Sequence, residues 1–235
     1  FGSTPLLTDA ALTVHEGDRI CLVGRNGSGK STTLNLVSGA LPLTSGTVSL
    51  WGSPISGLPA QTITRKGVSR TFQLVRLLPS MNVLENVMAG GVFGHRRRWG
   101  HGAERHAMEI LEKVGLARMA KAPVGQLTYI DTKRVELARA LAAEPKLLLL
   151  DEPMAGMNVE EKEDMSRFIL DVNDEYGTTI VLIEHDMGVV MDLSNQVFVL
   201  NFGNMIMDGT PEEVQNNPEV IKAYLGEEDL YATRA

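Results

Sequence analysis

The stretch GRNGSGKS, residues 24–31, decides the fold. It fits the phosphate-binding pattern G-x-x-x-x-G-K-[ST] and lies between an aliphatic run at 19–23 and a helical pattern at 30–39, the context that this pattern requires. Glycines let main-chain N–H groups close around phosphate oxygens, and the N-terminus of the following helix adds partial positive charge. A glycine-rich turn that matches by chance is the alternative, and the flanking strand and helix disfavour it. The sequence therefore predicts a nucleotide site in an α/β protein.

Two residues of this loop have specific expected tasks. Lys30 is expected to reach the β- and γ-phosphates, and the Ser31 hydroxyl is expected to ligate Mg²⁺. The nucleotide-binding residues that we predict in and just after the loop are Gly24, Asn26, Gly27, Ser28, Gly29, Lys30, Ser31 and Thr32.

A second buried run, LLLLDEP at 147–153, ends in two acids. If it lies beside the strand that precedes the phosphate loop, Asp151 comes close to Mg²⁺ and holds the ion through water. Glu152 is then placed to polarise an attacking water as a general base. Acids at the end of a strand can instead cap the next helix, and without the phosphate loop neither interpretation would be preferred. The combination with the loop favours the catalytic interpretation.

Gln73, in VSRTFQ, and His185, in IVLIEHD, each follow a predicted strand. Taken alone, each is more typical of an ordinary polar residue at a strand end. Both fall at carboxyl ends of strands, where open α/β sheets place their ligands, so we expect them to join the nucleotide site.

Short aliphatic or alternating runs predict strands, and apolar residues at helical spacing predict helices. The expected strands lie near 11–14, 19–23, 46–50, 68–72, 146–150, 178–183, 196–201 and 204–208. The expected helices lie near 30–39, 82–90, 103–114, 131–143, 159–175 and 211–225. The pattern predicts a nucleotide-binding α/β core formed by residues 1–73 and 145–235, with an inserted helical subdomain at 74–144.

The composition and net charge of the chain disfavour several classes of protein. The 235 residues are 43% hydrophobic with a mean hydropathy of −0.02, which fits a globular protein with a real core. No apolar stretch approaches the roughly 20 residues needed to cross a bilayer. The net charge of −7 disfavours a nucleic-acid surface. The single cysteine, Cys21, excludes a disulfide within the chain and favours a reducing cytoplasm. The basic stretch HRRRW at 95–99 is either a solvated loop or a docking patch.

Taken in order, these motifs resemble one family over almost the whole chain. The loop at 24–31, Gln73, the helix behind LTYID (127–131), LLLLDEP and IEHD look like the Walker A, Q-loop, signature, Walker B and switch-histidine elements of ATP-binding cassette (ABC) ATPases. The resemblance implies a P-loop NTPase core with a mostly parallel sheet, a small antiparallel β part on its N-terminal side and the inserted helical subdomain. Within the family, the segments AGMN, IEHDMGVVMDLS and DGTPEEVQNNPEVIKAYLGEE resemble the ATPase subunit of branched-chain amino acid importers.

The resemblance also implies roles for individual residues. The residues around Mg²⁺ would be Ser31, Gln73 and Asp151, and the catalytic residues would be Glu152 as base, His185 at the γ-phosphate and Gln73. Phe1 aligns with the aromatic residue that stacks on adenine, although a chain-terminal residue is often too loosely held to do so. ATP and Mg²⁺ are the expected cofactors.

The signature element departs from the family pattern LSGGQ, which caps the ATP held by the opposite subunit. Thr128 can replace the serine as a donor, but Tyr129 and Ile130 replace both glycines and Asp131 brings a negative charge toward a triphosphate. The T-x-x-D spacing also fits an ordinary N-cap. Two hypotheses follow: a heterodimer with unequal sites, or a homodimer whose backbone tolerates the bulky residues.

The function expected from the resemblance is that of an ATP-hydrolysing subunit of an importer, in which ATP binding and hydrolysis at a dimer interface drive solute transport. Its partners would be a second ABC ATPase subunit, the transmembrane permease subunits and, indirectly, a periplasmic or extracellular binding protein, with no nucleic acid. The expected location is peripheral, on the cytoplasmic face of the plasma membrane. A non-transport ABC-type ATPase of DNA repair or translation is the alternative. Such proteins usually carry two cassettes or a long coiled coil, and this sequence has neither.

Overall fold

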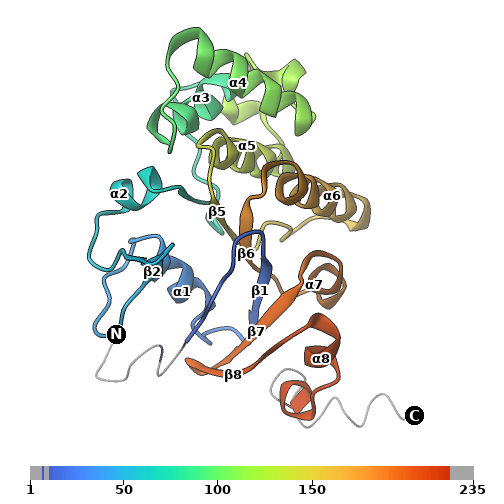
Figure 1. Cartoon of the computed structure of the whole chain (residues 1–235). Coiled ribbons are helices and arrows are strands. Elements are labelled where there is room, and N and C mark those ends of the chain that lie inside the picture. Colours follow the sequence, from blue (N-terminus) through green and yellow to red (C-terminus); the bar gives the residue numbers. More distant parts are fainter. Residues whose placement is uncertain (1–6, 8–10, 223–235) are drawn as a thin grey trace.

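The computed structural model describes residue 7 and residues 11–222, and a six-stranded sheet forms its centre (Figure 1). The strand order is β4-β5-β6-β1-β7-β8, and all neighbours are parallel except β7 and β8. The strands are β1 (Arg19–Gly24), β4 (Val68–Arg70), β5 (Leu147–Asp151), β6 (Thr179–Ile183), β7 (Gln196–Asn201) and β8 (Asn204–Gly209). A separate antiparallel pair consists of β2 (Ser49–Leu50) and β3 (Ser53–Pro54). The expected α/β class, with a mostly parallel sheet and a small antiparallel part, is confirmed.

The helices form two groups, one in the core and one between β4 and β5. Those of the core are α1 (Lys30–Val37), α2 (Ala60–Arg65), α6 (Val159–Tyr176), α7 (Met187–Leu193) and α8 (Pro211–Gln215). Between β4 and β5 the chain forms α3 (Val83–Phe93), α4 (Gly100–Lys113), two short 3-10 turns (Ala117–Met119 and Val124–Gln126) and α5 (Tyr129–Ala142).

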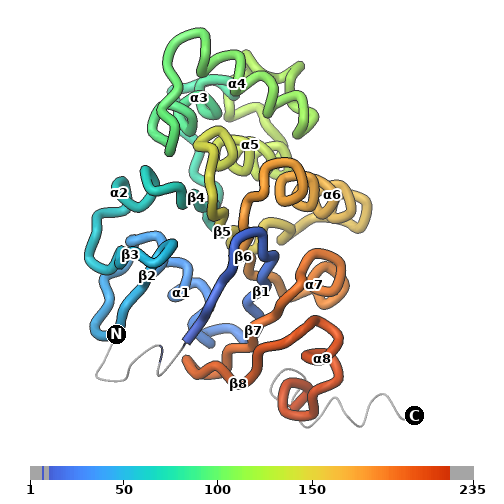
Figure 2. Tube along the Cα trace, viewed as in Figure 1, coloured from blue at the N-terminus to red at the C-terminus, as the bar shows by residue number. Residues whose placement is uncertain are grey.

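The segment between β4 and β5 leaves the sheet and returns to it at the same place. Figure 2 shows the chain passing from β4 through α3, α4 and α5 at one end of the molecule and back into β5, which pairs with β4. Residues 71–146, all of which the structure describes, contain no strand. The division into a core and a helical subdomain at 74–144 remains our proposal.

The core lies on both faces of the sheet because successive side chains of a strand point to opposite sides. On β1, Cys21 and Val23 pack into a cluster that includes residues of α5, α6 and α7, whereas Ile20 and Leu22 pack with Leu34 of α1. The strands β5 and β6 are buried at every position. Such continuous aliphatic runs are typical of parallel strands that are covered on both faces.

This topology brings the predicted motifs to one edge. The strands β5, β6 and β1 are neighbours and parallel, so their carboxyl ends lie side by side. The phosphate loop follows β1, Glu152 follows β5 and His185 follows β6 by two residues. Ligands of open α/β sheets bind at this edge.

Several expected elements differ in the structure. The strand expected at 11–14 is wrong: Leu12 and Val14 pack against the cluster around Leu34, so their alternation reflects packing without strand pairing. The expected strand 46–50 is reduced to β2, because a left-handed turn at Trp51 and Gly52 limits the hairpin to two residues per strand. The strand expected at 68–72 ends at Arg70.

The helices differ in smaller ways. The short helices α2 and α7 were not predicted. The expected helix 211–225 is interrupted at residues 216–217 and resumes at 218–222, the last residues that the structure describes. Its expected start is confirmed, since Thr210 and Glu213 form a capping box with Pro211 in the first turn.

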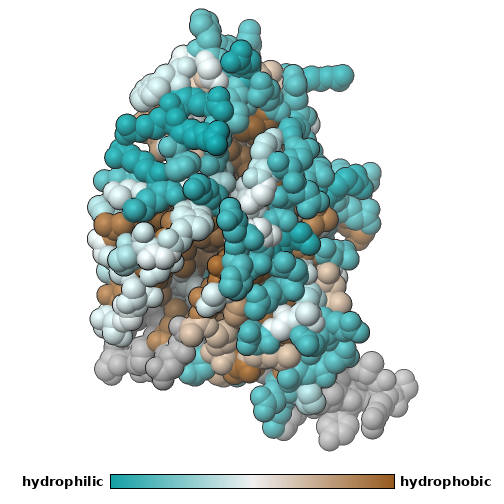
Figure 3. Space-filling view, viewed as in Figure 1, coloured by the Kyte–Doolittle hydropathy of each residue, from teal (hydrophilic) through white to brown (hydrophobic). Residues whose placement is uncertain are grey.

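The basic stretch 95–99 folds back on the end of α5. Arg96 and Arg98 both form ion pairs with Glu144, and His95 Nδ1 lies 2.7 Å from the main-chain oxygen of Arg65. These contacts favour a structured loop over a free basic patch. On the face drawn in Figure 3, hydrophilic side chains dominate this helical end.

Candidate nucleotide site

The phosphate loop depends on its glycines. Gly24 has a φ of +150°, and a Cβ atom there would lie 2.1 Å from the main-chain oxygen of Leu200, so only glycine fits between the loop and β7. Gly27 and Gly29 have φ values of +80° and +103°, a region that side chains disfavour. Gly29 is also the N-cap of α1 and offers no side-chain cap. The first N–H groups of α1 are therefore left for a ligand.

Lys30 turns back over the loop. Its Nζ atom donates to the main-chain oxygens of Gly24 at 2.6 Å and Arg25 at 3.1 Å. Burial lowers the pKa of Lys30, while the carboxylates of Glu152 and Asp151 oppose that shift. A phosphate would give this partly desolvated ammonium a negative partner. Ser28 is 2% exposed, and its hydroxyl has no hydrogen-bond partner among the described residues. The loop therefore also holds an unsatisfied polar atom that a phosphate could contact.

Ser31 and Asp151 approach each other across the edge of the sheet. The Ser31 hydroxyl lies 3.3 Å from Asp151 Oδ1, and Arg70 Nη2 donates to Asp151 Oδ2 at 3.0 Å. The Arg70 guanidinium also donates from Nη1 to Asn35 at 2.6 Å and to Ser38 at 3.1 Å, both near the end of α1. Arg70 therefore fixes the Asp151 carboxylate with one oxygen directed at Ser31.

The Ser31 hydroxyl and the Asp151 carboxylate could ligate Mg²⁺ if phosphates and water supplied the remaining ligands. The described residues hold no group of three or more His, Cys, Asp or Glu side chains suited to a metal. Mg²⁺ usually takes one or two protein ligands and completes its shell with phosphates and water. The Ser31 hydroxyl and the Asp151 carboxylate match that minimal donor set.

Three predicted residues meet at the Glu152 carboxylate. Gln73 Nε2 donates to Oε2 at 2.9 Å, and His185 Nε2 lies 3.0 Å from Oε1. The side chain of Glu152 is 18% exposed and that of His185 is 38% exposed, so the group remains open to solvent. Glu152 has a φ of +49°, an uncommon conformation that often occurs at functional sites.

The structure adds residues that the sequence analysis missed. Glu184 is buried and accepts hydrogen bonds from the main-chain N–H groups of Met154 at 3.1 Å and His185 at 3.3 Å. Burial raises the pKa of Glu184, and nearby Glu152 raises it further. Lys133 of α5 and Arg70 also touch the site. An acidic residue at the end of an apolar run is the signal that could have found Glu184.

The N-terminal turn of α5 is a capped helix start. The Thr128 side chain accepts from the Asp131 N–H at 3.1 Å, and its hydroxyl donates to Asp131 Oδ2 at 2.7 Å. The predicted N-cap is thus confirmed. Tyr129 is 54% exposed, and its ring lies against Gly156 in the loop after β5. In this structure the Thr128 hydroxyl is engaged within its own turn, so its predicted donation to a nucleotide stays a prediction.

The remaining predicted loop residues differ in exposure. Asn26 is exposed within the phosphate loop, and Thr32 is half-buried in the first turn of α1. Phe1 lies outside the described residues.

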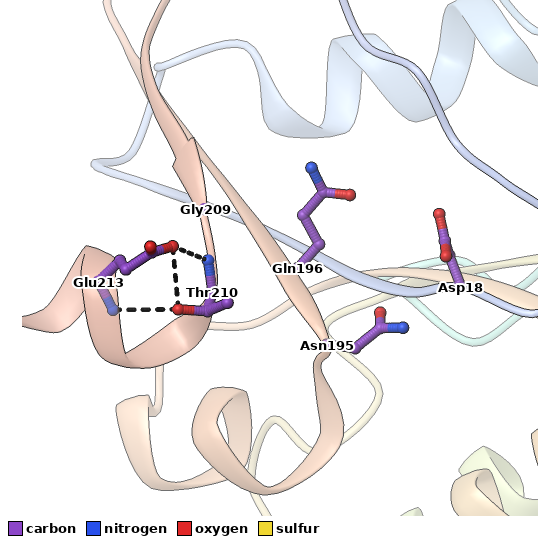
Figure 4. Close-up of a pocket in the computed structure, with 6 residues that line it drawn as sticks. All are labelled: Asp18, Asn195, Gln196, Gly209, Thr210 and Glu213. Atoms are coloured by element: carbon purple, nitrogen blue, oxygen red, sulfur yellow. Dashed lines mark hydrogen bonds between the residues drawn. The ribbon is translucent and has the colours of Figure 1, made fainter.

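A polar pocket lies away from this edge. Figure 4 shows it lined by Asp18, Asn195, Gln196, Gly209, Thr210 and Glu213. Asp18 precedes β1 and Gln196 begins β7, so the pocket lies at the amino ends of these strands. The phosphate loop lies at the carboxyl end of β1. It is not part of the candidate site.

Comparisons with known proteins agree with this geometry. A model of the ABC transporter family matches residues 7–155, and a model described as branched-chain amino acid ATP-binding cassette transporter matches residues 204–229. The chain is 39% identical to the high-affinity branched-chain amino acid transport ATP-binding protein LivG of Escherichia coli (strain K12), covering 97% of this chain and 94% of LivG. It is 40% identical to BraF, a protein of the same description from Pseudomonas aeruginosa, with the same coverage.

Solved structures give the same result. The ADP conformation of MJ1267, an ATP-binding cassette of an ABC transporter, superposes with a TM-score of 0.87 at 29% identity, covering 97% of this chain and 95% of that one. A dimeric post-hydrolysis state of the cassette MJ0796, bound to ADP and Pi, gives a TM-score of 0.80 at 28% identity, with coverage of 88% and 90%.

Proposed function

Since the chain belongs to the ABC transporter family as one of its ATPases, we propose that it is the ATP-hydrolysing subunit of an importer for branched-chain or related amino acids. The observation that carries the proposal is the Glu152 carboxylate, held between Gln73 and His185 at the sheet edge that also bears the phosphate loop. The relatives LivG and BraF, whose names specify branched-chain amino acid transport, support the solute class.

Each residue has a task that follows from its position. Lys30 and the N–H groups of the loop bind the β- and γ-phosphates, and Asp151, Ser31 and Gln73 would hold magnesium, which would offset phosphate charge when bound. Glu152 accepts a proton from the attacking water. Gln73 and His185 each contact one oxygen of that carboxylate, and its remaining lone pairs can accept a hydrogen bond from the water. His185 can then turn to the γ-phosphate.

The test uses Glu152→Gln in the full chain, assembled with its membrane partners. Removing a general base typically slows the chemical step about 10²- to 10⁴-fold, so turnover should fall by that amount while ATP affinity stays within about twofold. Glu163→Gln on α6, which takes no part in the site described above, serves as the matched control and should keep full turnover. ATP turnover that persists in Glu152→Gln would contradict the role of this carboxylate.

We further propose that the subunit works beside a second ABC ATPase. The solved MJ0796 cassette is dimeric, which supports an assembly in which the α5 turn of one subunit caps the nucleotide of the other. In this chain the cap is altered at Tyr129, Ile130 and Asp131, while its own hydrolytic set is complete. The proposal is therefore a heterodimer in which the partner carries the stronger cap, with a homodimer of two equivalent sites as the alternative.

Association with transmembrane permease subunits is part of the proposal. Within the described part of the chain, every helix is too short or too polar to cross a bilayer. Exposed apolar side chains flank Gln73 in the sequence: Leu74 is 78% exposed, and Phe72, Leu78 and Met81 are also exposed. Such side chains can take part in a protein interface, and docking through them would place the subunit peripherally on the cytoplasmic face of the membrane. An external binding protein would act only through the permease.

A further inference from the structure

One buried ammonium joins α5 to the residues of the site. Lys133 is 5% exposed, and its Nζ atom donates to the main-chain oxygen of Glu152 at 3.0 Å and lies 3.5 Å from that of Gln73. Hydrogen bonds from a charged donor are stronger than neutral ones, especially away from water. Lys133 thus contacts the main chain of two of the three residues that meet at the Glu152 carboxylate.

Two neighbours on α5 strengthen this connection. Burial raises the pKa of Glu136, which is 2% exposed, and the main-chain N–H groups of Phe72 and Arg76, on either side of Gln73, are near enough to lower it. Toward the N-terminus of α5, the Tyr129 ring packs so close to Gly156 that a Cβ atom there would lie 3.2 Å from it. The segments after β4 and after β5 are therefore both attached to the first two turns of α5.

We propose that Lys133 is a positioning residue that couples the N-terminal turn of α5 to Glu152 and Gln73. The inference rests on the proposed function, in which that turn caps the nucleotide of the opposite subunit. A movement of α5 on closure of the dimer is transmitted through the Lys133 ammonium to the carbonyls of Glu152 and Gln73. The cap of one site and the hydrolytic residues of the other then move together.

A purely structural role predicts different behaviour. If Lys133 only donates hydrogen bonds to buried carbonyls, replacing it lowers the free energy of unfolding. ATP binding and turnover then decrease in parallel, because less of the protein is folded. A positioning role instead separates binding from turnover. The Lys133 ammonium contacts the main chain of Gln73 and Glu152 and has no hydrogen bond to the described residues of the phosphate loop, so ATP binds as before while Glu152 loses its orientation.

The test compares Lys133→Gln, Lys133→Arg and the control Lys113→Gln, all in the full chain. Lys113 also lies on the helical segment, but its ammonium pairs with Glu175 and lies 4.9 Å from the ring centroid of Tyr176, away from the site. For each variant we would measure ATP affinity, turnover in the assembled complex, and hydrogen exchange of the amides at 72–76, 152 and 154 in the isolated chain.

We expect Lys133→Gln to keep ATP affinity within about twofold and to lose turnover by about tenfold or more, since small misplacements of a catalytic group have effects of this size. Exchange at both segments should rise, and Lys133→Arg should restore most of the turnover because it keeps a charged donor. Unchanged exchange and turnover in Lys133→Gln would overturn the inference, as would an arginine variant as impaired as the glutamine one. An unmodified complex that does not hydrolyse ATP would instead contradict the proposed function.

Discussion

In the proposed assembly the carboxyl edge of the sheet and the N-terminal turn of α5 each face a bound nucleotide, and the contacts of their side chains differ. At the sheet edge, Ser31, Asp151 and Glu152 lie within hydrogen-bonding reach of other site residues. At the α5 turn, the Thr128 hydroxyl is bonded to Asp131 of its own turn. If each region serves a different nucleotide of a dimer, a chain can retain its own hydrolytic set while its contribution to the opposite site weakens. The predictions below test that difference, from the largest expected effect to the smallest.

Breaking the buried pair at the sheet edge should have the largest effect. The side chains of Arg70 and Asp151 are 7% and 4% exposed, and Arg70→Met would leave the Asp151 carboxylate buried without its partner. Such a loss typically costs about 3 to 5 kcal/mol in the free energy of unfolding. Denaturant titration would measure it. A cost below about 1 kcal/mol, typical of surface pairs, would contradict the assigned burial of this pair.

Replacing Lys30 should separate binding from stability. Hydrogen bonds to charged groups contribute about 1.5 to 3 kcal/mol, so Lys30→Met should weaken ATP binding by about tenfold to a hundredfold. Because burial lowers the pKa of Lys30, the folded loop carries this charge at a cost, and the free energy of unfolding should not fall. Calorimetric titration and thermal unfolding of the same sample check both parts, with Lys113→Gln as the control.

Restoring the family pattern in α5 should sharpen the comparison. The double variant Ile130→Gly and Asp131→Gln removes one Cβ restriction and one negative charge near a bound triphosphate. In a Glu152→Gln background with Mg·ATP, it should favour the dimer by about 1 to 2 kcal/mol, or about tenfold in the dissociation constant. Analytical ultracentrifugation would measure the change. A double variant that dimerises no better than its parent would contradict the view that these two residues weaken the cap.

The smallest effect is expected far from both regions. Arg98 pairs with Glu144 near the end of α5, and the two side chains are 38% and 18% exposed. Arg98→Ala should therefore lower the free energy of unfolding by about 1 kcal/mol or less and leave ATP affinity unchanged. Loss of ATP binding in this variant would show that the loop at 95–99 communicates with the sheet edge.

The sequence was sufficient to predict the features that a local pattern of residues determines. The buried runs of β1, β5 and β6 and the spacing of the phosphate loop were sufficient to place Lys30, Asp151 and Glu152 at one edge. Arg70 and Lys133 were missed because their partners are 81 and 19 residues away, a separation that no local pattern encodes. The strand expected at 11–14 was wrong for a related reason, since alternation predicts which side chains are buried but not whether the main chain pairs.

The central claim is that this chain has a complete hydrolytic set but a weak cap, and the solution mass of Glu152→Gln with Mg·ATP tests it most directly. The substitution should slow hydrolysis while leaving binding intact, which would hold any closed dimer together. We predict a monomer that binds ATP, and a dimer when Ile130→Gly and Asp131→Gln are added. A stable dimer of Glu152→Gln alone, at low salt, would contradict the claim and would establish that LTYID can cap a bound nucleotide.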